Sequence, residues 1–212
     1  MRTKDKTKIN KLIEQRQAEI LDAANRVFSK HGFAKTTVDQ VAVEAGLGKG
    51  TIYQYFKSKK ELFLAVGRNG MDKLKDTMIE EIEQEEDPVD RIEKAIRTYL
   101  LFFQKNTDLA NIFMYEQSEF KKEIQKKYFE NYYGHVNRMQ ETFKEAMKLT
   151  LIKDMNVDDS IVILISMLNG LVYIWQVEGM KYSLESKVPA ILEIFFTGIL
   201  KNEKRKKRYE RS

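Results

Sequence analysis

The chain has 212 residues, of which 42% are hydrophobic and 33% are charged, with 10 glycines, 2 prolines and no cysteine. The lack of cysteine excludes disulfides, thiolate catalysis and cysteine-based zinc sites. So few glycines and prolines predict helices with few interruptions. The first ten residues, MRTKDKTKIN, have no apolar segment of the kind found in secretory signals. We therefore expect a helical, cytoplasmic protein of two domains.

Charge is unevenly distributed along the chain. Residues 1–66 carry 13 basic and 7 acidic side chains, residues 67–200 carry 17 and 23, and residues 201–212 carry 7 and 2. A basic segment before an acidic body favours DNA binding, since attraction to phosphate is then confined to one module. We expect a DNA-binding domain with a basic N-terminal arm at 1–66, an effector-binding and dimerisation domain at 67–200, and a basic tail at 201–212. The tail reads as a solvated end, with non-specific attraction to DNA as the alternative.

The first predicted helix ends at His31 and Gly32, because glycine readily adopts the positive φ that follows a helix end. A short second helix follows. Thr37 can cap it, with Gln40 three residues later as its capping-box partner. Gly46 then ends this helix.

A short third helix follows that glycine turn, and it directs Leu47, Ile52 and Phe56 inward. Its outward side offers hydrogen-bonding groups and flat aromatic rings: Lys49, Gly50, Thr51, Tyr53, Gln54 and Tyr55. Two short helices joined by a tight turn are typical of a helix-turn-helix, whose second helix lies in the major groove of DNA. The sequence therefore predicts double-stranded DNA as a partner.

The next helix begins at Ser58, which can form a capping box with Glu61 and places Lys59 and Lys60 in the first turn. Cations in that position oppose the helix dipole. An isolated run of lysines would indicate a solvated surface. Beside a helix-turn-helix, the free N–H groups and two ammonium groups indicate a site for a DNA phosphate.

The segment AGLGKGTIYQYFKSKKEL, with HGFAKTTVDQVA before it, resembles the signature of the TetR/AcrR family of transcriptional repressors. The motif covers roughly residues 18–66, and the remainder resembles the family in length and helical pattern. The resemblance implies an all-α fold, with a three-helix DNA-binding domain followed by a helical ligand-binding and dimerisation domain. It also implies base or phosphate contacts by the following residues: Thr36, Thr37, Lys49, Gly50, Thr51, Tyr53, Gln54, Tyr55 and Lys59.

Three positions depart from the family pattern. Val38 stands where some members carry a base-reading arginine, Gly48 replaces the usual serine cap, and Tyr55 stands where histidine is common. The DNA sequence bound by a relative therefore cannot be transferred to this protein.

Capping residues also predict the later helices. The fourth runs from about Ser58 to the acidic segment EEDP at residues 85–88, and Asp87 with Pro88 begins the fifth. Asn106 or Thr107 begins the sixth, and the seventh spans about residues 119–149. Asn156 with Asp159 caps the eighth, and Ser186 with Pro189 begins the ninth.

The eighth predicted helix is apolar nearly all round, so it needs cover on more than one side. Its apolar run, Ile161 to Trp175, is shorter than the roughly 18 residues that suggest a membrane span, and we expect no membrane partner. The eighth and ninth helices form the dimer in the resembled family. The resemblance thus implies a homodimer through Ile161, Leu164, Leu168, Ile191, Ile194 and Phe195. The alternative is that both helices are ordinary core.

The fifth to eighth helices carry many aromatic and methionine side chains, which more often form ordinary core than a binding site. The resemblance implies that part of this set lines an effector pocket: Phe102, Phe103, Phe113, Met114, Tyr132, Tyr133, Met139, Phe143, Met167 and Trp175. Composition favours a long, largely apolar effector, such as an acyl chain or a lipophilic drug.

Little in the sequence supports catalysis. The chain has two histidines, and it lacks a glycine-rich phosphate loop after a strand, an HExxH motif and a GxSxG motif. We expect no enzyme activity, no cofactor and no metal site. The expected function is a ligand-responsive repressor that binds a palindromic operator as a dimer and is released by an apolar small molecule. The alternative is an architectural or protein-partner-controlled DNA-binding protein without such an effector.

Overall fold

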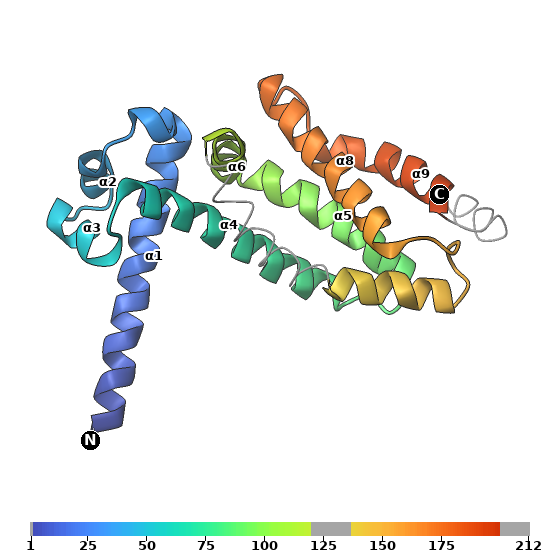
Figure 1. Ribbon diagram of the computed structural model, residues 1–212, viewed down its shortest axis with the longest axis horizontal. Coiled ribbons are helices and arrows are strands. Elements are labelled where there is room, and N and C mark those ends of the chain that lie inside the picture. Colours follow the sequence, from blue (N-terminus) through green and yellow to red (C-terminus); the bar gives the residue numbers. More distant parts are fainter. Residues whose placement is uncertain (1, 120–136, 200–212) are drawn as a thin grey trace. The chain divides into compact units, whose positions relative to one another are not determined.

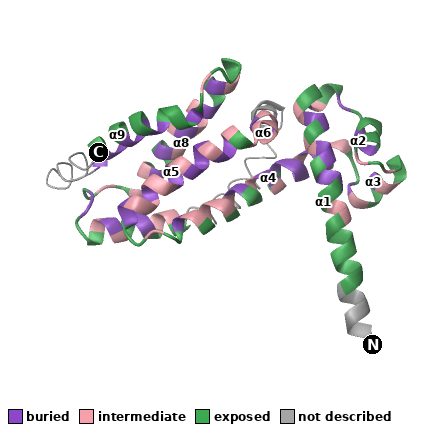
Figure 2. Ribbon diagram, turned by 180° about the vertical axis from the view of Figure 1, so that it is seen from behind, coloured by how far each residue is buried: buried purple, intermediate pink, exposed green. Residues whose placement is uncertain are grey.

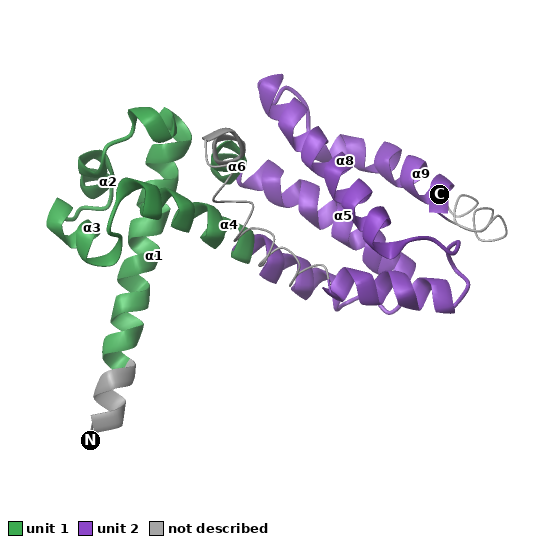
Figure 3. Ribbon diagram, viewed as in Figure 1, with its two compact units in different colours: residues 1–72, 107–121 green, residues 73–106, 122–212 purple. Residues whose placement is uncertain are grey.

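The computed structural model describes residues 2–119 and 137–199, without the side chains of residues 2–7 and 114–119. The described residues form helices and contain no β-strand, which confirms the expected all-α fold (Figure 1). They belong to two compact units, shown in Figure 3. The first unit comprises residues 1–72 and 107–121, and the second comprises residues 73–106 and 122–212.

The first unit is a small helical core built around aromatic rings. It contains α1 (Arg2–Lys35), α2 (Val38–Glu44), α3 (Lys49–Tyr55), the first part of α4 (Lys59–Ile82) and α6 (Thr107–Glu119). The ring of Phe63 lies 5.0 Å from that of Phe28 and 5.2 Å from that of Phe33. Since Phe63 belongs to α4 and the other two belong to α1, these rings hold the start of α4 on the end of α1.

Helix α1 is broken near its end at Gly32, whose φ of 72° and ψ of 167° are not helical. This confirms the expected helix end, because glycine adopts a positive φ without the steric cost of a Cβ. One further turn leads to Lys35. Residues 8–15 of α1 are exposed, as the green part of this helix in Figure 2 shows, and they include the apolar Ile9, Leu12 and Ile13.

Helix α6 joins the first unit, whereas we expected the boundary after residue 66 and this helix in the second domain. The Ser29 hydroxyl donates to the Asp108 carboxylate at 2.8 Å. At Gly70 of α4, an added Cβ would lie 2.6 Å from Cδ2 of Leu109, so glycine permits the close approach of these helices. Residues this far apart in sequence leave no local pattern that would reveal the pairing.

The second unit is organised around α5 (Pro88–Lys105), which packs against three other elements. The unit also contains the second part of α4, a helix at residues 137–148, α8 (Val157–Val177), the 3-10 turn η1 (Leu184–Lys187) and α9 (Val188–Ile199). Two predicted caps are confirmed, since the Asp87 carboxylate accepts from the N–H of Val89 at 2.7 Å and the Asn156 side chain accepts from that of Asp159 at 3.2 Å. Much of the expected seventh helix lies outside the described residues.

Helix α8 buries one side and exposes the other. Its buried residues are Ile161, Leu164, Leu168, Val172 and Trp175. Its exposed large hydrophobic residues, which we call the apolar flank, are Val162, Ile163, Tyr173, Ile174 and Val177. Length and composition alone would let α8 cross a membrane, although we expected its apolar run to be too short. Length and composition are weak evidence for a membrane span, because a helix between two protein surfaces has the same composition.

Candidate nucleic-acid interface

The start of α2 is fixed by the predicted capping box. The hydroxyl of Thr37 accepts from the N–H of Gln40 at 3.3 Å, and the Gln40 side chain accepts from the N–H of Thr37 at 2.8 Å. Two N–H groups that would lack a partner at the helix start are thus satisfied by the protein itself. Thr37 is exposed, but its hydroxyl is already engaged in this cap.

A tight turn at Gly46 sets the geometry between α2 and α3. Gly46 has a φ of 64°, its N–H donates to the carbonyl of Val43 at 3.1 Å, and the N–H of Leu47 donates to that of Ala42 at 2.9 Å. This pair of bonds is a Schellman motif, which needs a positive φ at the glycine. The predicted turn is confirmed and holds α3 at a defined angle to α2.

Helix α3 is anchored by the single buried residue Ile52, while Phe56 is buried just beyond its end. Its exposed residues include Lys49, Gly50, Tyr53 and Gln54, whereas Thr51 and Tyr55 are half-buried. Gly48 caps the helix without a side-chain hydrogen bond. The exposed face thus offers a cation, an amide and a phenol on a helix, an element whose diameter fits a major groove.

Lys49 already has a partner within the protein. Its ammonium lies 2.7 Å from the carboxylate of Asp39 at the start of α2, and both side chains are at least half exposed. The hydrogen bond that the Lys49 ammonium donates to the Asp39 carboxylate raises the pKa of Lys49 above its ordinary value. Sequence reasoning missed Asp39, because only the fold brings residues 39 and 49 together. A base or phosphate must compete with this carboxylate for Lys49.

Thr36 does not lie on the exposed surface, contrary to our expectation for a DNA contact. Its side chain is 1% exposed, and its hydroxyl donates to the carbonyl of Gly32 at 2.8 Å. The hydroxyl instead satisfies a carbonyl at the break in α1. Thr36 therefore belongs to the support of the interface.

The start of α4 carries the expected capping residues. The hydroxyl of Ser58 accepts from the N–H of Glu61 at 3.1 Å, and the Glu61 carboxylate accepts from the N–H of Lys57 at 2.8 Å. Lys59 and Lys60 are half-buried, whereas Lys57 is exposed. The ammonium of Lys59 points back to the end of α1, where it donates to the carbonyl of Phe33 at 2.8 Å.

The residues expected to line an effector pocket are divided between the two units. Phe113 is half-buried in α6 of the first unit. In the second unit, Phe102, Phe103, Phe143 and Trp175 are buried, and Met139 and Met167 are half-buried. Tyr132 and Tyr133 lie outside the described residues, as does the side chain of Met114. Several of these residues make ordinary core contacts, as with Phe102 and Phe103, whose rings lie 5.6 Å apart.

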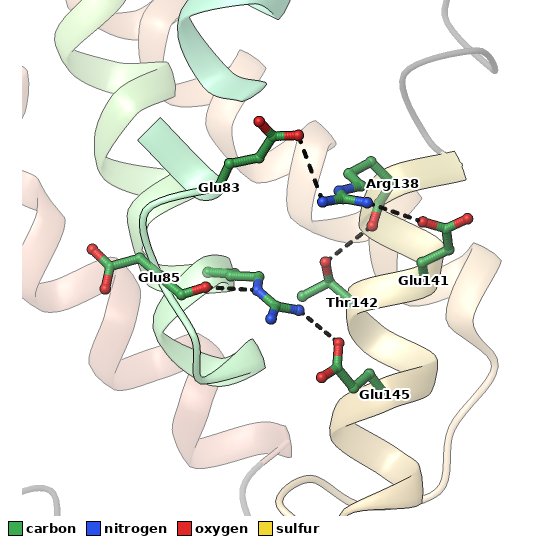
Figure 4. A pocket seen from close by; sticks show the side chains of 7 residues that line it. Glu83, Glu85, Arg138, Glu141, Thr142 and Glu145 are labelled. Atoms are coloured by element: carbon green, nitrogen blue, oxygen red, sulfur yellow. Dashed lines mark hydrogen bonds and ion pairs between the residues drawn. The ribbon is translucent and has the colours of Figure 1, made fainter. Parts of the chain in front are cut away.

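A cleft of about 280 Å³ in the second unit is lined by charged groups instead. Figure 4 shows Arg138 among glutamates from the segment that follows α4 and from residues 137–148, and Arg91 also lines the cleft. The Arg91 guanidinium lies 2.6 Å from Glu145 and donates to the carbonyl of Glu85 at 2.9 Å. Because its charged groups pair with one another and none of the expected pocket residues lines it, this cleft does not suit an apolar effector.

Five of the six residues expected at a dimer interface are buried inside the single chain: Ile161, Leu164, Leu168, Ile191 and Phe195. The ring of Phe195 lies 6.3 Å from that of Phe143. A side chain already buried in its own chain has little surface left for a partner, so we correct this assignment to core. Ile194 is 65% exposed and remains available. The expected interface residues did not include the apolar flank, which is the side of α8 that stays exposed in the single chain.

Comparisons with known proteins agree with this architecture. Residues 20–66 match the family model for bacterial regulatory proteins of the tetR family, and residues 85–184 match that for a tetracyclin repressor-like C-terminal domain. The chain is 24% identical to the fatty acid metabolism regulator protein of Bacillus subtilis (strain 168) over 182 residues, or 85% of this chain and 94% of that protein.

Two solved structures have the same fold. The fatty acid degradation regulator FadR from Bacillus halodurans gives a TM-score of 0.79 at 22% identity, covering 86% of this chain and 95% of that one. FadR from Bacillus subtilis in complex with stearoyl-CoA gives a TM-score of 0.79 at 24% identity, covering 85% and 98%. With family models matching both its helix-turn-helix and its C-terminal helices, the chain belongs to the TetR family of transcriptional regulators.

Proposed function

We propose that this protein is a cytoplasmic repressor that binds a palindromic operator as a homodimer and releases it when a long-chain acyl compound binds. The observation that carries the DNA-binding part is the outward face of α3. Lys49, Tyr53 and Gln54 are exposed there, while Ile52 and the Gly46 turn fix the helix in place. A rigid helix with exposed donors and acceptors is suited to base edges in a major groove.

The apolar flank of α8 supports the dimer. Ile163 is 58% exposed, Val177 is 60% exposed, and Ile194 of α9 is also exposed. A second copy is the proposed occupant, because a two-fold interface brings the same surface of each chain together. Two copies related in this way would also present two copies of α3, as a palindromic operator requires. We expect the two copies of α3 in the dimer to lie about 34 Å apart, or somewhat more.

Two observations support an acyl effector. The chain resembles a fatty acid metabolism regulator over 85% of this chain and 94% of that protein, and a solved relative has stearoyl-CoA bound. The second unit also contains several of the aromatic and methionine side chains that suit an apolar ligand. Because α4 spans both units and α6 follows α5 directly into the first unit, the effector would act on α3 through these two helices.

Selection of bound sequences from a random DNA pool would identify the operator. Stearoyl-CoA, coenzyme A and stearate should then be titrated against the protein–operator complex. We expect stearoyl-CoA to lower operator affinity about 5- to 150-fold, the usual range of allosteric coupling, and coenzyme A alone to have little effect. The fluorescence of Trp175, the single tryptophan of the chain, should change at the same concentrations.

The experiment also separates this proposal from the alternative of a partner-controlled DNA-binding protein. Operator binding that no acyl compound changes would favour that alternative. Tight acyl binding that alters Trp175 fluorescence but leaves operator affinity constant would make the ligand site incidental. If the protein showed no preference for any DNA sequence, the proposal that it is a repressor would be wrong.

A further inference from the structure

The ammonium group of Lys59 is surrounded by backbone carbonyls at the end of α1 and in the connection from α1 to α2. It donates to the carbonyl of Phe33 at 2.8 Å, to that of Thr36 at 3.0 Å and to that of Ala34 at 3.4 Å. The same nitrogen lies 4.3 Å from the centre of the Phe33 ring. A lysine ammonium has three N–H donors, so these three carbonyls use all of them.

This arrangement is favourable for the end of α1. The last carbonyls of a helix have no partner within the helix and carry partial negative charge. After the break at Gly32, the short turn at residues 33–35 leaves such carbonyls close together. A cation placed among these carbonyls donates the hydrogen bonds that they lack and opposes their partial negative charge. Lys59 thus acts as a C-terminal cap supplied by another helix.

The same contacts explain why α4 begins with a lysine, although a cation at a helix start is unfavourable for the dipole of that helix. The ammonium of Lys59 is directed away from its own helix and toward the negative end of α1, where it is favourable. Two N–H groups near this helix start also have partners within the protein, since that of Lys57 donates to Glu61 and that of Glu61 donates to Ser58. The Lys59 ammonium, which we expected at a DNA phosphate, is thus engaged by carbonyls of the protein itself.

We infer that Lys59 is a positioning residue, which fixes the connection between α1 and α2 and thereby the orientation of α2 and α3. Its ammonium does not bind a DNA phosphate. Thr36, one of its acceptors, directly precedes Thr37, the residue that caps α2. Helix α2 in turn holds α3 through the Gly46 turn. A displacement at Thr36 would thus be transmitted to the exposed face of α3.

Lys59→Met in the full chain tests this inference, with Lys57→Met as the matched control. Both changes remove one ammonium group, but Lys57 is exposed. Each variant should be compared by thermal unfolding and by binding to the selected operator and to a random-sequence duplex over a range of salt concentrations. We expect Lys59→Met to lower the Tm by about 3–6 °C, because three carbonyls lose a charged donor, and Lys57→Met to leave it nearly unchanged.

The DNA measurements separate positioning from phosphate binding. Loss of positioning should lower operator affinity about tenfold more than random-duplex affinity and leave the salt slope of random-duplex binding unchanged. Loss of a phosphate contact should weaken both duplexes equally and reduce the slope by about 0.9. A reduced slope for Lys59→Met, an unchanged Tm, or an unchanged ratio of the two affinities would each overturn the inference.

Lys59→Arg provides a second test if the methionine variant folds poorly. A guanidinium keeps the charge for a phosphate, but its planar fork cannot direct three N–H groups from one nitrogen. We expect its Tm to fall as in Lys59→Met, whereas a phosphate-binding residue would tolerate arginine. This inference rests on the proposed DNA binding for its affinity measurements. The Tm comparison needs no DNA, so failure of the repressor proposal would not be mistaken for failure of the inference.

Discussion

Helices α3 and α8 both leave one side exposed, but the two exposed sides differ in chemistry. Helix α3 buries Ile52 and presents Lys49, Tyr53 and Gln54. Helix α8 buries five residues and still exposes the large hydrophobic residues of its apolar flank. A polar surface is stable in water until a ligand arrives, whereas large hydrophobic residues gathered on one side of a helix often mark an interaction site. The polar side of α3 is the surface that we propose for nucleic acid, and the apolar flank is the surface that we propose for a second copy.

The largest effect should come from placing charge on the apolar flank. We expect the double variant Ile163→Glu and Ile194→Glu to remain helical and become monomeric, because two-fold symmetry would bring four new carboxylates into one interface. Operator affinity should fall by about 100-fold or more, since a monomer cannot engage both half-sites at once. Light scattering and operator titration measure the two effects.

Two variants show whether this effect belongs to the interface. Glu193→Ala changes a neighbouring exposed residue and should leave the dimer intact. Ile161→Glu should instead destabilise the fold, because that side chain is 1% exposed and its charge would be buried without a partner. An intact dimer in the double variant would move the interface elsewhere.

The next effect concerns the polar face of α3. Gln54→Ala should lower operator affinity about 5- to 150-fold, since a bidentate contact to a base contributes about 1–3 kcal/mol of discrimination. Binding to random duplexes should hardly change. Repeating the sequence selection with the variant would reveal a relaxed preference at one position of each half-site. Equal weakening on all duplexes would assign Gln54 to the DNA backbone.

A smaller effect should follow from removing the carboxylate beside Lys49. Asp39→Asn frees an ammonium that now lies 2.7 Å from a carboxylate oxygen. Affinity for every duplex should rise about threefold, and more at low salt, because one negative charge near the DNA is lost. Asp76→Asn, an equal change of charge on the second unit, is the control. The same gain in both variants would indicate net charge alone.

The smallest effect is expected at the contact between α4 and α6. Gly70→Ala places a Cβ against Leu109, although the better helix propensity of alanine offsets part of the strain. We expect a net loss of about 1 kcal/mol, or about 2–4 °C in Tm. Leu109→Ala opens that space, so the double variant should lose less than the two single changes together. Strict additivity would indicate that the two residues do not press on each other.

The sequence predicted most of the local structure correctly because its signals are local. Thr37 with Gln40 and Ser58 with Glu61 lie three residues apart, and such pairs cap a helix wherever it packs. The positive φ of Gly32 and Gly46 was likewise readable, since these glycines end apolar stripes. Hence the helix-turn-helix, its exposed residues on α3 and most helix boundaries followed from the chain alone.

The assignments that failed concern contacts between distant residues. Thr36 belongs to the family motif, yet its burial depends on how the chain turns at Gly32. Ile161, Leu164 and Leu168 have the hydrophobicity of an interface, which is also that of a core. Periodicity identifies an apolar side but does not say whether the same chain or another copy covers it.

The sequence by itself determined that this protein is helical, where its helices begin, and which short helix presents polar groups to solvent. Only the tertiary structure decided that α6 joins the first unit, that Asp39 lies beside Lys49, and that the Lys59 ammonium contacts the end of α1. Caps and periodicity act over three or four residues along the chain. The partner of a charged or apolar side chain depends instead on which distant residues the fold brings within a few ångströms, and no local pattern encodes that distance.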